Sequence, residues 1–259
     1  MSTQQNSGFT MPYEPHPTCP QPEDANARIW RYLTKSKFLA LLDSGQLYFC
    51  RVDLFEDPAE CSLPPSYVEA LSREESKLSL DLYGLTELEW RERTVRDFKH
   101  QFYASCWHMA DIESPEMWER YGGGHDGVAL CSTYTRLIDA FTLQEERVFV
   151  GTVRYGDLPP DSFGGFEFVT QKRQLFEVER EVRALLWRSE NMMVNYEDLS
   201  AQPPPLPPST PKGHCVPVDL SRLVASVVTS PCSHGSLSEE ILSRFRQRGY
   251  RIPIVESQL

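Results

Sequence analysis

Residues 29–50, IWRYLTKSKFLALLDSGQLYFC, determine how the chain begins to fold. The first six residues alternate apolar and polar side chains, as a half-buried strand does. Thr34 is suited to cap a following helix and Gly45 to end it, before a second strand, QLYFC. The side chains expected to face the core from this helix are Phe38, Leu41 and Leu42. The stretch therefore predicts a strand–helix–strand unit.

Outward from this unit, helical and strand-like segments alternate along the chain. Residues 66–101 are charged and helical, with a capping box at Thr86 and Glu89, and Ser114 begins a helix before MWERY. A helix through KRQLF is expected before the strand EVRALLW. Further strands are predicted at FYASCW, GVALC, RVFVGTVRY and VASVVTS. The pattern predicts an α+β fold with a central mixed, partly antiparallel sheet flanked by helices.

The end of the chain predicts a β–α–β unit. Ser236 and Glu239 are expected to cap its helix, which ends at Gly249. The side chains expected to cover the core from it are Leu237, Ile241, Leu242 and Phe245. YRIPIV follows as an edge strand, because Pro253 cannot donate to a ladder.

These elements form one predicted domain, residues 28–259, after a polar, proline-rich lead of residues 1–27 that we expect to be disordered. The proline-rich insertion at 202–213 is expected to be a surface loop; docking of a partner as polyproline II is the alternative. No apolar run approaches the roughly 20 residues needed to span a bilayer. The N-terminus has no signal-peptide pattern, so we expect a cytoplasmic protein with no membrane partner.

Charge and cysteine content exclude several classes of protein. The formal net charge of −11 argues against nonspecific binding of DNA or RNA. Seven cysteines without a C-x-x-C pair, several of them in apolar strands, are expected to be reduced thiols rather than a disulfide framework. The six histidines have no zinc-ligand spacing, and we predict no metal site.

Three glutamates occupy every second position up to the start of a predicted apolar strand: Glu177, Glu179 and Glu181. On a strand they would share a face, and crowding would raise the pKa of one carboxyl into the range of a general acid or base. A carboxylate there could also stabilise positive charge that develops on a sugar. The predicted catalytic residues are Glu181 and, assisting it, Glu179. The alternative is ion pairing with nearby arginines, namely Arg173, Arg180 and Arg183.

Arg31 lies between Trp30 and Tyr32 on the first strand. Because a buried arginine needs a partner, it is expected either to grip a pyrophosphate or to form a structural ion pair. The candidate acidic partners are Asp57, Glu60 and Glu181. In the first case Arg31 and Tyr32 belong to a nucleotide site.

Trp118 and Tyr121 precede residues 122–127, GGGHDG, which we call the glycine loop. The loop's backbone N–H groups could surround a phosphate, and the two aromatic rings could border a planar base such as adenine or nicotinamide. The plainer interpretation is that both rings belong to the core side of one helix.

Two other groups of residues have the side chains for chemistry. Cys106 and His108 share a strand face, but same-strand side chains are about 6–7 Å apart, so a buried thiol is favoured over a nucleophile–base pair. Asp57 and Glu60 could hold a divalent cation together with Glu181, although an Asp before proline more often only starts a turn.

Several motifs together resemble a widespread bacterial family catalogued as a domain of unknown function. They are IWRYLT, LFEDPAE, YASCW, MWERYGGGHDGVAL, KRQLFEVEREVRAL, VASVVTSP and VESQL, which cover about residues 29–259. The family usually has Asn-Asp-Pro where this chain has Glu56-Asp57-Pro58. The resemblance implies no settled activity.

A second resemblance is to the ADP-ribosyltransferase fold. The opening IWRYLT…LLDSGQLYF is similar to the strand, helix, Gly and strand with which that fold often begins, and Glu179-Arg180-Glu181 is similar to its late E-x-E. The Ser-Thr-Ser motif of the arginine-modifying branch has only Ser132-Thr133 as a counterpart. This resemblance implies a transferase that uses NAD.

The leading hypothesis is therefore a cytoplasmic, ADP-ribosyltransferase-like enzyme that uses NAD or a related nucleotide on a macromolecular acceptor, as a toxin or defence effector. The alternatives are a non-catalytic ligand- or protein-binding module of a bacterial defence system, and a metal-dependent hydrolase or nuclease using Asp57, Glu60 and Glu181. Convergence of Arg31, Tyr121 and Glu181 on one site would favour the enzyme, and dispersal would favour the module.

Overall fold

The computed structural model describes residues 13, 15–74, 85–143, 146–157, 166–189, 206–233 and 235–259, and it has the predicted α+β architecture. The strands are β1 (Arg28–Leu33), β2 (Gln46–Arg51), β3 (Phe102–Met109), β4 (Val128–Thr133), β5 (Phe149–Thr152), β6 (Arg154–Tyr155), β7 (Gln171–Lys172), β8 (Glu181–Trp187), β9 (Gly213–Pro217), β10 (Ser226–Thr229) and β11 (Ile254–Glu256). The helices are α1 (Lys35–Ser44), α2 (Pro65–Glu74), α3 (Glu87–Lys99), α4 (Pro115–Tyr121), α5 (Tyr134–Asp139), α6 (Leu220–Leu223) and α7 (Gly235–Arg248). None of these helices is long and apolar enough to cross a membrane.

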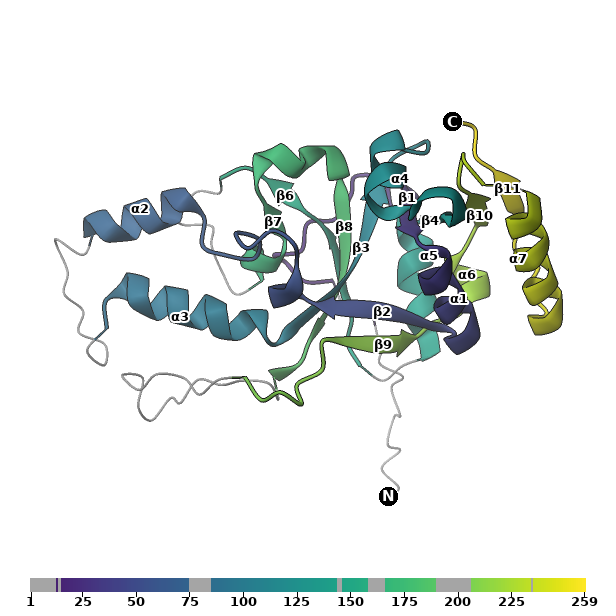
Figure 1. The fold of residues 1–259 in the computed structure, drawn as a ribbon. Coiled ribbons are helices and arrows are strands. Elements are labelled where there is room, and N and C mark those ends of the chain that lie inside the picture. The colour runs from purple at the N-terminus through teal and green to yellow at the C-terminus, as the bar shows by residue number, and fades with distance from the viewer. Residues whose placement is uncertain are drawn as a thin grey trace, which may run out of the picture.

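The sheet branches at β3, which lies at the centre of the molecule (Figure 1). One path runs β11-β10-β4-β1-β3-β2-β9, and β8 also pairs with β3 and carries β5 on its other side. The pairs in this sheet are antiparallel except β10 with β11, which are parallel. The mixed sheet and the C-terminal β–α–β unit are therefore confirmed.

The opening stretch folds as its residues predict. The Thr34 side chain accepts a hydrogen bond from the Lys37 backbone N–H at the start of α1. Gly45 ends the helix at φ 64°, a left-handed conformation that glycine adopts without steric cost. The helix buries Phe38, Leu41 and Leu42. Local capping thus fixes both ends of α1, and the apolar face fixes which side packs on the sheet.

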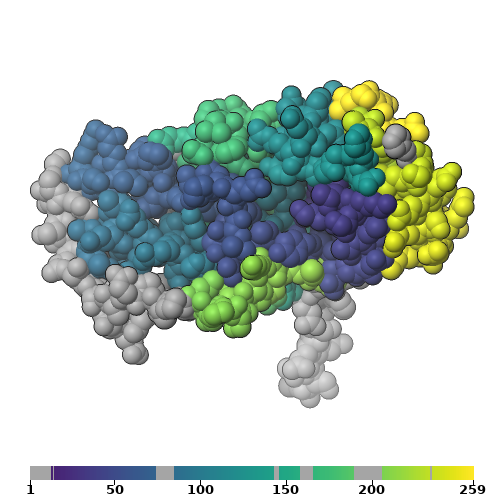
Figure 2. All heavy atoms as spheres, in the orientation of Figure 1, coloured from purple at the N-terminus to yellow at the C-terminus, as the bar shows by residue number. Residues whose placement is uncertain are grey.

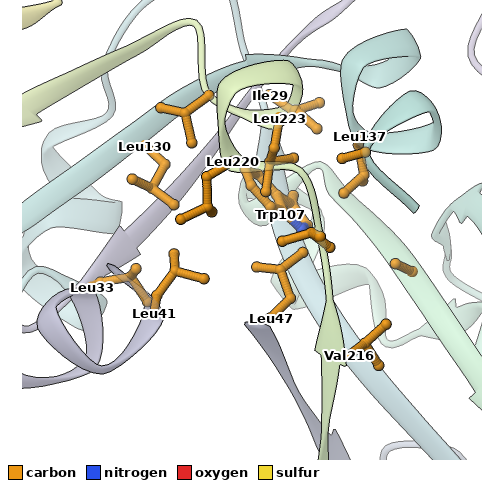
Figure 3. Close-up of a cluster of buried hydrophobic side chains, with 14 of the residues drawn as sticks. Ile29, Leu33, Leu41, Leu47, Trp107, Leu130, Leu137, Val216, Leu220 and Leu223 are labelled. Atoms are coloured by element: carbon orange, nitrogen blue, oxygen red, sulfur yellow. The ribbon is translucent and has the colours of Figure 1, made fainter. Parts of the chain in front are cut away.

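The two faces of β1, β3 and β8 bury different kinds of side chain. On one face Ile29, Trp107 and Val182 belong to the main hydrophobic cluster. Figure 3 shows Trp107 among Ile29, Leu47, Leu220 and Leu223 in this cluster. Because side chains alternate along a strand, the residues next to these face the other way. That second face carries Trp30, Tyr32, Cys106, His108, Glu181 and Arg183.

Three predicted segments differ in detail. KRQLF does not form an α-helix: β7 is followed by a 3-10 helix, η6 (Gln174–Glu179). RVFVGTVRY is divided into β5 and β6, since β6 pairs with β7 in a separate small sheet. The helix α7 begins at Gly235, so Ser236 lies inside it rather than capping it, and Leu242 is 40% exposed.

Part of the expected lead packs on the domain. Residues 1–12 and 14 lie outside the described part, as do residues 202–205 of the insertion. Cys19 is buried against Gly151 of β5, and the Pro20 carbonyl accepts a hydrogen bond from the Thr152 N–H at 2.7 Å. Cys19 and Pro20 therefore cover the edge strand β5, whereas the disorder expected of the lead stays a prediction.

Candidate functional site

Five charged side chains meet on the second face of the sheet: Glu60, Lys172, Glu179, Glu181 and Arg183. We call them the buried charge cluster, since none is more than 8% exposed. They come from the turn after β2, from β7, from the end of η6 and from β8. Charges so deeply buried are stable only when paired. The cluster is therefore assembled by segments distant in sequence.

Glu181 and Arg183 form the inner pair of the cluster. The Arg183 Nε and Nη2 atoms lie 3.0 and 2.9 Å from the two carboxylate oxygens of Glu181, a bidentate geometry. Nη2 also donates to Glu60, and Nη1 donates to the Val169 carbonyl at 2.7 Å. Each nitrogen of the guanidinium therefore has a hydrogen-bond partner within the protein, as a residue that is 0% exposed requires.

Lys172 joins the three carboxylates. Its Nζ lies 2.6 Å from Glu179, 3.3 Å from Glu181 and 3.5 Å from Glu60. Burial alone would lower the pKa of this ammonium, but the charges of Glu181 and Glu60 raise it above its usual value. Lys172 therefore carries its proton and neutralises the outer part of the cluster.

The predicted raised pKa is wrong for Glu181. Burial favours the neutral acid, but the neighbouring charges of Arg183 and Lys172 outweigh it and hold the pKa of Glu181 at about 2. The Cys106 thiol and the Tyr155 hydroxyl also border Glu181, the latter accepting from the Glu181 backbone N–H at 2.7 Å. A carboxylate this acidic and this enclosed is a poor proton acceptor, so the structure favours an ion-pair role for Glu181.

Unlike Glu181, Glu179 contacts side chains that reach the surface of the protein. Its Oε1 atom lies 2.9 Å from Nη1 of Arg120 and 3.4 Å from the hydroxyl of Tyr121, while Oε2 faces Lys172. The side chains of Arg120 and Glu179 are 44% and 7% exposed, and Tyr121 is 44% exposed. Burial and the Glu179 charge raise the pKa of Tyr121 to about 12, so its hydroxyl stays protonated as a donor. Glu179 is thus a buried carboxylate under two half-exposed side chains of α4.

Backbone geometry brings Glu179 and Glu181 together. They do not share a strand face as predicted, since Glu179 ends η6 and only Glu181 lies on β8. Between them Arg180 has φ 37°, and Cys61, next to Glu60, has φ 54°. These are the positive-φ residues other than glycine in the described part of the chain, and both adjoin the buried charge cluster. Such conformations cost about 1–3 kcal/mol and gather at functional sites.

Arg31 lies on the opposite face of the sheet from Glu181. Trp30 pairs with His108, and His108 pairs with Glu181, so the alternation turns Arg31 toward the main core. Arg31 stacks on the Trp107 ring, donates to Ser105 and donates to the Tyr48 carbonyl at 3.0 Å. The expected pairing of Arg31 with an acidic residue is therefore wrong.

The predicted aromatic residues are brought near one another, but only one reaches the surface. Tyr32 and Trp118 are 7% exposed each, with ring centroids 5.0 Å apart. The Tyr32 hydroxyl accepts from the Ser114 N–H at 2.9 Å, and the Trp118 indole donates to Glu113 at 2.9 Å. Tyr32 and Trp118 therefore pack on the buried side of α4. The half-exposed aromatic side chain of this helix is Tyr121.

The two other constellations are not assembled. His108 Nδ1 lies 2.7 Å from the Glu179 carbonyl, which can only accept, so Nδ1 carries the proton. Burial and the nearby Glu181 raise the pKa of the Cys106 thiol well above its usual value, which disfavours a thiolate. Asp57 pairs with Arg173 at 2.8 Å rather than with a cation site. Within the described ranges no three His, Cys, Asp or Glu residues are arranged to hold a metal ion.

Two hydrogen bonds join the glycine loop to Ser230, the residue directly after β10. The Ser230 hydroxyl donates to the Gly124 carbonyl at 2.9 Å, and the Ser230 N–H donates to the Gly127 carbonyl at 2.9 Å. Gly123 and Gly124 have φ of 70° and 75°, which explains why glycine is needed there.

Substituting Gly127 by alanine is expected to lower the free energy of unfolding by about 1–3 kcal/mol, the usual cost of overpacking. The added Cβ would lie 2.0 Å from the Gly122 carbonyl oxygen and 3.1 Å from the Trp118 ring. Urea unfolding measures the effect. Gly235→Ala is the control, because nothing lies within 4 Å of its Cβ position. Equal stability of the two variants would contradict the close packing around Gly127.

Sequence patterns did not single out Lys172, Arg120 or Tyr155. Lys172 is one of two adjacent basic residues, and nothing local distinguishes it from Arg173, which is exposed and pairs with Asp57. Its role arises because β7 places its side chain against three carboxylates from other segments.

No protein-family model and no curated protein matches the sequence, so the resemblance to the bacterial family stays a prediction. Among solved structures, DarT of Thermus sp. 2.9 in complex with NAD+ aligns with a TM-score of 0.39 and 10% identity over 92% of this chain and 98% of that chain. The complex with carba-NAD+ aligns with a TM-score of 0.37 and 13% identity over 92% and 97%. The complex with ADP-ribosylated ssDNA gives 0.35 and 10% over 92% and 96%. Likeness at these TM-scores and identities shows neither a family nor an activity for this chain.

Proposed function

We propose that this protein is a transferase that uses NAD or a related nucleotide, with Glu179 rather than Glu181 as the carboxylate at the reacting centre. The observation that carries the proposal is the position of Glu179. Its carboxylate is buried, yet its outer oxygen contacts two half-exposed side chains, Arg120 and Tyr121. A ligand that engages these two side chains at the surface would meet Glu179 directly beneath them.

The surface pair supplies the contacts that a nucleotide requires. The Arg120 guanidinium can bind a phosphate through two parallel N–H groups, and the Tyr121 ring offers a face for a planar base. Arg120 would leave its ion pair with Glu179 as it binds phosphate. Lys172 then remains 2.6 Å from Glu179 and keeps the carboxylate in place.

Glu179 would serve as a charge-stabilising group. When the bond between ribose and nicotinamide breaks, nicotinamide leaves with the bonding electrons and positive charge develops on the sugar. A fixed carboxylate next to that charge lowers the barrier, as in glycoside hydrolysis. An acceptor nucleophile then forms the new bond and releases its proton. The remaining members of the buried charge cluster hold Glu179 in position.

Nucleotide binding tests the surface pair. We expect NAD or ADP-ribose to raise the melting temperature of the protein, and Arg120→Ala to weaken binding about tenfold or more, the scale of a hydrogen bond between charged groups. Arg248→Ala is the matched control, because Arg248 is 41% exposed and also forms a 2.9 Å ion pair, with Asp43. Isothermal titration calorimetry gives both affinities.

Either of two results would contradict the proposed site. One is the absence of any thermal shift with nucleotides at millimolar concentration. The other is an affinity for nucleotide that Arg120→Ala and Arg248→Ala change equally, since the two substitutions remove the same charge from different surfaces.

A non-catalytic binding module, as in a bacterial defence system, is the second candidate. It is favoured by the dispersal of the predicted residues: Arg31 lies on the opposite sheet face, and Glu181 is committed to Arg183 and Lys172. Nicotinamide release separates the two candidates. A transferase releases nicotinamide from NAD when offered protein or single-stranded DNA acceptors, whereas a binding module holds the nucleotide unchanged.

A further inference from the structure

A small pocket lies at the other end of the sheet from Glu179, where the parallel strands β10 and β11 end and α7 begins. Its volume is about 130 Å³, below the roughly 300 Å³ at which pockets for drug-sized ligands start. The polar side chains that line it are Thr229, Ser230, Ser233, Ser238, Glu256 and Ser257. This corner is where the chain ends in Figure 1, and Figure 2 shows the yellow C-terminal segment packed against the teal region of α4. The pocket is large enough for a few water molecules or one small metabolite.

The side chain of Thr229 lacks a hydrogen-bond partner, which indicates a ligand in this pocket. Thr229 is 1% exposed, and its Oγ1 atom has no hydrogen-bond partner within the described structure. Val227, two residues earlier, packs in the same cluster as Leu237 and Ile241 of α7. By strand alternation the Thr229 side chain therefore points to the side that α7 covers. A buried hydroxyl without a partner is costly, so this one is expected to gain its partner from a bound molecule.

The N-terminus of α7 faces the same space. Gly235 and Ser238 from its first turn line the pocket, and the first N–H groups of a helix have no partner within the helix. The end of a 14-residue helix also carries partial positive charge. Together with the Thr229, Ser233 and Ser238 hydroxyls, these groups suit a compact anionic group such as a carboxylate.

Glu256 determines the rest of the ligand. It pairs with Thr229 across β10 and β11, so both side chains project on the side of α7. The described residues that line the pocket include no lysine or arginine. Among these residues, a simple anion such as phosphate would meet the Glu256 carboxylate without a compensating cation. A ligand that also carries an ammonium group would satisfy both ends of the pocket.

We infer that this pocket binds a small zwitterion of the α-amino acid class. The carboxylate lies at the N-terminus of α7 with the Thr229 hydroxyl, and the ammonium group lies against Glu256. The site is preformed, because the Ser230 hydroxyl is anchored on the Gly124 carbonyl and Ser257 is anchored on Glu113. It shares no residue with the proposed Glu179 site, so either assignment can fail without the other.

Calorimetric titration of the 259-residue chain tests the inference. The probes are glycine and L-serine as zwitterions, with acetate, methylamine and inorganic phosphate as single-charge controls. We expect the amino acids to bind at least about tenfold more tightly than any control, since each single-charge probe loses one charge-assisted contact. Thr229→Val should weaken amino-acid binding about tenfold without lowering the melting temperature, because the hydroxyl loses no partner within the protein.

Glu256→Gln is the second variant, on an exposed residue. It should weaken amino-acid binding by a similar factor while improving acetate binding, because the repulsive charge is gone. Glu179→Gln should leave amino-acid affinity unchanged. No binding of amino acids at 10 mM, phosphate binding tighter than glycine, or a Thr229→Val variant with wild-type affinity would each overturn the inference.

Discussion

Exchanging Glu181 for glutamine is expected to lower the free energy of unfolding by about 3–5 kcal/mol, the usual cost of breaking a buried ion pair from one side. The change keeps the shape of the side chain but removes the negative charge that Arg183 contacts bidentately and that Lys172 contacts at 3.3 Å. Arg183 is 0% exposed, so bulk solvent cannot replace the lost bidentate partner, and Glu60 remains as its carboxylate contact. The cost therefore comes from the cation that is left behind.

Urea unfolding followed by circular dichroism measures this loss. Glu177→Gln is the matched control, because Glu177 belongs to the same run of glutamates but is exposed. It should change stability by less than about 0.5 kcal/mol. A Glu181→Gln protein as stable as the control would mean that the pair with Arg183 contributes little, and the ion-pair role of Glu181 would be wrong.

The same carboxylate gives a pH dependence of known sign. Its pKa of about 2 in the folded protein lies below the ordinary value of about 4.3 for glutamate. Its stabilisation is therefore complete above about pH 4.3 and is lost as the pH falls toward 2. Glu181→Gln should remove this part of the acid transition. Unfolding curves of the two proteins should converge as the pH approaches 2.

Exchanging Glu179 for glutamine is expected to reduce turnover of NAD by about a hundredfold or more, the scale of losing one positioned charge-stabilising group. Folding should survive, because Lys172 keeps Glu181 at 3.3 Å and Glu60 at 3.5 Å as partners. The measurement is nicotinamide release with a protein or single-stranded DNA acceptor, alongside the melting temperature. The nucleotide should still bind, since Arg120 and Tyr121 are unchanged.

The two glutamate variants are controls for each other. The proposal requires Glu179→Gln to be folded and inactive, and Glu181→Gln to be destabilised. A Glu179→Gln enzyme with wild-type turnover would exclude Glu179 as the reacting-centre carboxylate. A wild-type protein that binds nucleotide but releases no nicotinamide with either acceptor would favour the binding module.

The sequence predicted secondary structure correctly where the stabilising contacts lie within a single segment. The predicted caps of α1 are Thr34 at its start and Gly45 at its end. The capping box of Thr86 and Glu89 is also present, and Ser114 caps α4. These signals are readable in sequence because a cap and its helix lie within a few residues of each other. The prediction failed at η6, where the αL conformation of Arg180 turns the chain between Glu179 and Glu181.

The sequence by itself determined the α+β class, the strand–helix–strand opening and the C-terminal β–α–β unit. Only the tertiary structure decided what each carboxylate contacts. Strand register places Arg31 on the opposite sheet face, and Lys172, Arg183 and Glu60 meet Glu181 from three segments. The physical reason is the range of the forces: hydrogen bonds of caps act over a few residues, whereas the burial and pairing of charges depend on which distant segments fold together.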